Sequence, residues 1–154
     1  MKIELSQKER MLLEDGKKQE ELCVKKYQGY AGKVQDVTLK NLLTEIAQEE
    51  QHHHNMIDQM LQGMEPNMAH GGGATNPQNN NTFKVPSGNT NDQLLLEDLL
   101  STEKYVSSFY DTLVFESADP KVRQAVQHIQ KDEQGHGEKL FNYMNQHGMY
   151  NVKY

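Results

Sequence analysis

Two segments of this chain carry the same glutamate and histidine residues at the same spacing. Each contains a lone glutamate followed by a Glu-x-x-His, and the six residues are Glu20, Glu50 and His53, then Glu103, Glu133 and His136. Matching residues are 83 positions apart (103 minus 20, 136 minus 53). In four-helix bundles, two helices that each supply a glutamate and two that each supply a Glu-x-x-His form a two-metal site. The repeat therefore predicts that all six residues bind two divalent metal ions, iron or manganese, between which these ligands do not discriminate.

Two helices are predicted to position the first set of ligands. Ser6 and Glu9 have the spacing of a capping box, which indicates a helix over about 7–34. Asp36 can cap a second helix, which keeps a helical pattern over about 37–61 before glycine and proline end it. The joint between them is short, so we expect an antiparallel hairpin.

The second half of the chain repeats this organisation after a polar linker. Residues 63–91 are rich in Gly, Asn, Pro and Thr, and we expect them to form a flexible crossover. A second capping-box pattern lies at residues 90–93, and Asp119 is followed by a proline suited to the first turn of a helix. These signals predict a third and a fourth helix over about 92–117 and 120–147.

The apolar stripe of the second predicted helix points Glu50 and His53 into the core. The stripe consists of Leu39, Leu43, Ile46, Ile57 and Met60. Glu50 and His53 fill the gap in this stripe at the same helical spacing, so both face inward. Their neighbours Glu49, His52 and His54 fall beside the stripe, and we expect them at the helix edges or in solvent.

The same reasoning applies to the other three helices. It turns the lone glutamates Glu20 and Glu103 inward, and it selects Glu133 and His136 over Asp132, which lies off the stripe. Four ionised carboxylates in a dry core repel one another and resist burial, whereas two divalent ions would balance their charge. The alternative, that these are polar core residues placed by chance, must explain four glutamates and two histidines at matching depth.

Two tyrosines also belong to the repeat. Tyr27 and Tyr110 lie seven residues after the lone glutamates, about 10 Å along each helix. The favoured interpretation is core packing with a hydrogen-bonded hydroxyl. A hydrogen bond to a metal ligand, or a redox function, is the alternative.

The composition excludes several classes of protein. The chain of 154 residues fits one domain over 1–154. Its net charge of −6 gives no basic patch for binding nucleic acid. Cys23 is the single cysteine, which rules out an internal disulfide or a four-cysteine iron centre. No segment is apolar over the length of a membrane span, and the N-terminus lacks the apolar core of a signal peptide. We therefore expect synthesis in the cytoplasm without a signal peptide.

The chain resembles two nested groups of proteins. Its ligand pattern resembles the ferritin-like superfamily of rubrerythrins, bacterioferritins and manganese catalases. More closely, residues 45–54 (EIAQEEQHHH), 100–105 (LSTEKY) and 147–150 (HGMY) are similar to the spore coat protein F family of endospore-forming bacteria. The resemblance implies a ferritin-like antiparallel four-helix bundle with one long crossover, a location in the spore coat and other coat proteins as partners. We also expect a homo-oligomer.

Two functions are compatible with these residues. The first is a metal-binding protein that consumes peroxide or oxygen, as a catalase-like or peroxidase-like oxidoreductase. The second is a structural component of the spore coat in which the metal only stabilises the bundle or is absent. The catalytic residues and the substrate are not predicted by the sequence.

Overall fold

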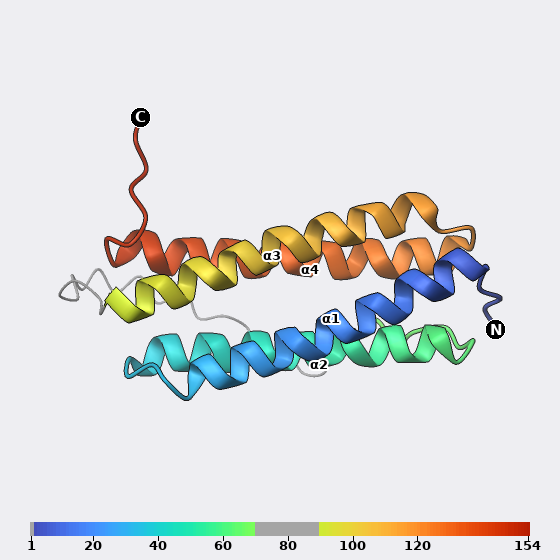
Figure 1. The fold of residues 1–154 in the computed structure, drawn as a ribbon, viewed down its shortest axis with the longest axis horizontal. Helices are drawn as coiled ribbons and strands as arrows, with labels where there is room; N and C mark the ends of the chain where they lie inside the picture. Colours follow the sequence, from blue (N-terminus) through green and yellow to red (C-terminus); the bar gives the residue numbers. More distant parts are fainter. Residues whose placement is uncertain (1, 70–89) are drawn as a thin grey trace.

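Four helices of 25 to 27 residues make up most of the computed structural model, which describes residues 2–69 and 90–154 (Figure 1). They are α1 Gln7–Ala31, α2 Val37–Leu61, α3 Thr90–Glu116 and α4 Pro120–Gln146. The described residues contain no strand, only an isolated antiparallel bridge between Lys2 and Met64. The predicted all-α four-helix bundle is confirmed. The middle of the predicted linker, residues 70–89, lies outside the described part of the chain.

The caps predicted for α1, α2 and α4 are formed. The Ser6 hydroxyl accepts a hydrogen bond from the Glu9 amide, and the Glu9 carboxylate accepts one from the Ser6 amide. Asp36 and Asp119 each accept a hydrogen bond from the amide two residues later, with Pro120 in the first turn of α4. The capping box predicted at residues 90–93 depends on the Thr90 side chain, which lies outside the described part of the chain.

The helix bounds differ slightly from those expected. Helix α1 ends at Ala31 rather than near residue 34, because the amides of Lys33 and Val34 both turn back to the carbonyl of Tyr30. This tight turn reverses the chain before Asp36 begins α2. Helix α3 begins at residue 90, two residues earlier than expected.

The helices pack as two antiparallel hairpins. Helix α1 packs against α2 and α3 against α4, and the hairpins meet through α1 with α3 and α2 with α4. Figure 1 shows α1 and α3 running in opposite directions, with the end of α2 and the start of α3 at opposite ends of the bundle. This placement of the two helix ends is the one that the predicted long crossover requires.

Two apolar cores fill the two ends of the bundle. One includes Leu13, Ile57 and Leu113, and the other includes Leu43 and Leu140, all fully buried. The predicted metal ligands come from the middle of each helix, between these cores. Apolar packing on both sides separates the polar centre from water at the bundle ends.

Gly16 lets α1 approach α3 closely. Glycine is a poor helix former, and a Cβ atom at this position would lie 3.2 Å from Cε1 of Phe109 and 3.6 Å from Cδ1 of Ile57. The ring of Phe109 thus occupies the space that a larger residue would need.

In the described residues, no helix combines the length and apolar composition that crossing a membrane requires.

Candidate metal centre

The structure brings all six predicted ligands together inside the bundle. Helices α1 and α3 each supply one glutamate, and α2 and α4 each supply a Glu-x-x-His. The most exposed of the six is Glu103, at 3%. The stripes predicted for the four helices therefore select the residues that are buried in the structure.

The six side chains form two overlapping groups that could each hold a metal ion. One group is Glu20, Glu50, His53 and Glu133, and the other is Glu50, Glu103, Glu133 and His136. Within each group the candidate ligand atoms lie within 4.8 Å of one another. Glu50 and Glu133 belong to both groups, so their two oxygens are placed to serve two neighbouring positions.

Each histidine points one ring nitrogen into this cluster. Nδ1 of His53 lies 3.0 Å from Oε1 of Glu133 and 3.2 Å from Oε2 of Glu50. Nδ1 of His136 lies 3.2 Å from the other oxygen of Glu50, Oε1. The two imidazole rings stack with their centroids 5.9 Å apart. Nδ1 is thus the nitrogen of each ring that is placed to bind a metal.

The other ring nitrogen of each histidine contacts an acid from the opposite hairpin. Nε2 of His53 lies 2.9 Å from Oδ2 of Asp132, and Nε2 of His136 lies 2.5 Å from Oε2 of Glu49. A carboxylate in this position fixes the orientation and tautomer of a metal-binding imidazole. Glu49 and Asp132 can therefore orient the two histidines.

Sequence reasoning missed this contact because it treated acids beside the stripe as surface residues. The side chain of Glu49 is 29% exposed and that of Asp132 is 16% exposed, so both lie at the edge of the core. The repeat contained the signal, since both positions are acidic and 83 residues apart (132 minus 49). His54, also expected at the edge, lies with Nε2 3.2 Å from Oε1 of Glu21.

Two buried tyrosines connect the hairpins at the ligands. The Tyr27 hydroxyl donates a hydrogen bond to Oε1 of Glu103, and the Tyr110 hydroxyl donates one to Oε1 of Glu20. Burial, followed by the charge of these carboxylates, raises the pKa of both hydroxyls well above the ordinary range. Both tyrosines therefore stay protonated and act as donors. They are core residues and also hydrogen-bond predicted ligands.

The carboxylates and imidazoles shift one another's protonation. Burial, then the charges of Glu50 and Glu133, raises the pKa of Glu20 well above its ordinary value. Burial opposes the charged form of His53 and His136, but hydrogen bonds to the surrounding carboxylates outweigh it and raise both pKa values well above the ordinary one. Without a metal, the surrounding carboxylates therefore favour the protonated form of both imidazoles.

Three buried carboxylate oxygens of the cluster accept no hydrogen bond. They are Oε2 of Glu20, Oε2 of Glu103 and Oε2 of Glu133. Buried polar atoms normally have a partner, and a carboxylate oxygen without one is costly. A cation bound in the cluster would satisfy these atoms, and carboxylate with imidazole is a donor set that suits manganese and iron. The residues fit the predicted metals.

One comparison with known proteins gives a match. Residues 91–153 match the Coat F domain family. The matched segment contains α3 after its first residue, all of α4 and most of the C-terminal tail. The predicted resemblance to the spore coat protein F family is thereby confirmed for this part of the chain, which contains Glu103, Glu133 and His136. No curated protein and no solved structure matches the chain.

Proposed function

We propose, from the Coat F domain at residues 91–153 and the buried ligand cluster, that this protein is a component of the spore coat that binds two metal ions and consumes peroxide or oxygen. One observation carries the metal part of this proposal: two groups of four potential ligands overlap in Glu50 and Glu133. Two ions of iron or manganese held by these two groups would use all six side chains.

Charge balance supports two ions. The cluster holds four carboxylates, and two divalent cations offset four negative charges while both histidines bind as neutral imidazoles. A single divalent ion would leave two buried negative charges that protons on Glu20 or on a histidine would have to offset. Two ions balance the four carboxylates while both histidines remain available as ligands, which supports two ions over one.

The bound ions would supply oxidation and reduction by changing oxidation state, with hydrogen peroxide able to serve as both oxidant and reductant. The protein holds the ligands in place around them. Tyr27 and Tyr110 donate hydrogen bonds to the carboxylates of the opposite hairpin, and Glu49 and Asp132 hold the imidazole rings. The apolar cores on both sides keep bulk water away from the centre. These features favour a preorganised site.

A second function has its own supporting observation. In the metal-free protein, His53 and His136 can carry positive charge, because carboxylates raise both pKa values. Two imidazolium ions and a protonated Glu20, whose pKa is also raised, would compensate most of the charge of the cluster. The bundle could therefore serve as a structural coat component without metal.

Metal content is the first test. Protein purified without chelators and analysed by inductively coupled plasma mass spectrometry should contain close to two equivalents of iron or manganese. Glu50→Ala removes a shared ligand and should lose most of the metal, whereas Glu21→Ala, at an exposed neighbour of Glu20, should not. If the wild type, after reconstitution with iron or manganese, holds less than about half an equivalent of metal per chain, the two-metal proposal is rejected and the structural function is favoured.

Peroxide consumption is the second test. If the wild type binds metal, it should consume hydrogen peroxide faster than the same concentration of free metal, and Glu50→Ala should not. Metal binding without such activity would leave a metal-stabilised structural protein.

A further inference from the structure

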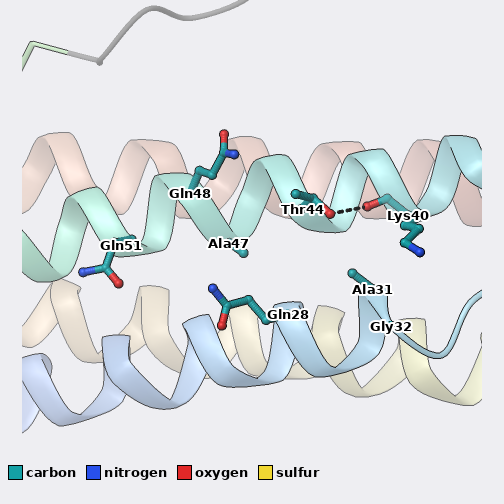
Figure 2. Close-up of a pocket in the computed structure, with 8 residues that line it drawn as sticks. All are labelled: Gln28, Ala31, Gly32, Lys40, Thr44, Ala47, Gln48 and Gln51. Carbon is teal, nitrogen blue, oxygen red and sulfur yellow. Dashed lines mark hydrogen bonds between the residues drawn. The ribbon is translucent and has the colours of Figure 1, made fainter.

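A hollow of about 490 Å³ lies between α1 and α2, on the outer side of their hairpin (Figure 2). Small residues, Ala31, Gly32 and Ala47, line it together with longer polar side chains. Figure 2 shows Gln28 lying between the two helices, with the ribbons of α3 and α4 behind them. The hollow therefore opens away from the other hairpin and is separate from the metal centre.

Two residues that line the hollow are smaller than their equivalents in the second hairpin. Gly32 corresponds to Phe115 in the second hairpin (115 minus 83). Likewise Ala47 corresponds to Gln130, whose side chain donates a 2.9 Å hydrogen bond to the carbonyl of Ser107 and so links α4 to α3. Small residues in the first hairpin thus replace large ones at the equivalent positions of the second.

Phe115 forms a projection at the position equivalent to the hollow. It is 82% exposed, the most exposed large apolar side chain within the described helices. An exposed phenyl ring of this kind is a common anchor in protein interfaces. Because Phe115 and the hollow lie on the outer sides of opposite hairpins, one molecule presents both without using either.

The charges around these two features are complementary. Lys40 lines the hollow and is exposed. Asp111, one helical turn before Phe115, is also exposed, so it lies beside the ring on α3. The acid beside the ring and the lysine at the hollow have opposite charges, which would favour a contact between the two surfaces.

We propose that copies of this chain associate head to tail, with Phe115 of one copy seated in the α1–α2 hollow of the next. A contact between two different surfaces of the same chain leaves one of each free at the ends, so it extends into an open assembly unless it closes into a ring. This self-association is independent of metal binding and of the function proposed above.

The first test blocks each surface in turn and measures the size of the full-length protein by analytical ultracentrifugation over a dilution series. The wild type should associate with increasing concentration. Phe115→Asp should weaken association roughly tenfold or more, whereas Leu94→Asp, on the same helix and 68% exposed, should not. Circular dichroism melts would show that each variant is folded.

A bulky side chain can obstruct the hollow. Gly32 lines it, and Gly32→Phe places there the residue found at the equivalent position of the second hairpin, where the ring is exposed. The backbone there is right-handed helical and a Cβ meets only ordinary contacts of 3.5 Å or more, so the variant should fold. Gly32→Phe should stop association, whereas Gly29→Phe, where a Cβ has no neighbour within 4 Å, should leave it unchanged.

A mixture of the two blocked variants gives the decisive result. Phe115→Asp retains the hollow and Gly32→Phe retains Phe115, so each alone should be monomeric while the mixture forms heterodimers that cannot grow. The proposal is overturned if the wild type stays monomeric at all concentrations, if Phe115→Asp assembles like the wild type, or if the mixture forms no heterodimer or assembles further.

Discussion

The hydroxyl of Tyr27 on α1 donates a hydrogen bond to the carboxylate of Glu103 on α3. The equivalent residues of the repeat, Tyr110 and Glu20, form the same contact in the opposite direction. Because α1 and α3 are antiparallel, the spacing of seven residues (27 minus 20, 110 minus 103) places each tyrosine opposite the glutamate of the other hairpin. The two halves of the chain thus hold each other's predicted ligands.

Replacing the tyrosine tests this relationship. Tyr27→Phe removes the only hydroxyl that Glu103 accepts from in the described structure, and the other oxygen of Glu103 already lacks a hydrogen-bond partner. The buried carboxylate would keep only the imidazole of His136, whose Nδ1 lies 3.5 Å from Oε1 of Glu103. Losing the hydroxyl should lower the free energy of unfolding of the metal-free protein by about 1–3 kcal/mol. Urea denaturation measures this change. The control is Tyr105→Phe, at a tyrosine that is 64% exposed, which should change the free energy of unfolding by less than about 0.5 kcal/mol. An equally small effect of Tyr27→Phe would contradict the prediction.

The acids that contact the histidines should control metal affinity. Glu49→Gln and Asp132→Asn each remove the charge that faces Nε2 of His136 or His53 while keeping the size of the side chain. Loss of such a partner typically weakens metal binding by about 10–100-fold. Competition with a metal-binding dye would measure the affinity. Glu45→Gln serves as the control, because Glu45 is exposed and, like Glu49, pairs with Lys139. If Glu49→Gln and Asp132→Asn both bind metal with unchanged affinity, these acids do not position the imidazoles.

Periodicity in the sequence was enough to find the helices and the buried cluster. A glutamate such as Glu50 stands in a stripe of apolar residues, so its burial follows from helix geometry alone. The partner of a side chain on another helix does not follow from that geometry, because it depends on how the helices are rotated and shifted against one another. This is why Tyr27 could be placed in the core but not assigned to Glu103, and why the contact of Glu49 with His136 was missed.

Glu9 illustrates the same limit. The capping box predicts its local hydrogen bond to the Ser6 amide, which the structure forms at 2.7 Å. Its other oxygen accepts hydrogen bonds from the amides of Ala118 at 2.8 Å and Asp119 at 2.9 Å, in the turn between α3 and α4. One carboxylate therefore joins the start of α1 to a turn more than 100 residues away. Local sequence patterns contain no signal for this second function.

Glu9→Gln should change how stability depends on pH. Burial disfavours the charged form of Glu9, but hydrogen bonds from the amides of Asp119, Ser6 and Ala118 outweigh it and lower the pKa below its ordinary value of 4.5. A lowered pKa in the folded state means that Glu9 stabilises the fold above pH 4.5 and loses this contribution as the pH falls through the folded value. At pH 7 the variant should be about 1–3 kcal/mol less stable than the wild type, and the difference should narrow in acid.

Urea denaturation between pH 7 and pH 3 would follow this difference. Glu14→Gln, at an exposed acid on the same helix, should give a curve parallel to that of the wild type. A stability difference for Glu9→Gln that stays constant over the whole range would show that the charge of Glu9 contributes nothing.

Metal binding should release protons. Carboxylates around His53 and His136 raise both pKa values well above the ordinary one, which favours the protonated form of both rings in the metal-free protein. A metal ion requires the neutral imidazole, so binding at pH 7 should release about two protons from the rings, and affinity should rise with pH. The pKa of Glu20 is also raised, and its ionisation would add to this number. Calorimetric titration with Mn²⁺ in buffers of different ionisation enthalpy counts the protons. His136→Gln should release about one proton fewer than the wild type, and binding without proton release would show that the rings are neutral before the metal enters.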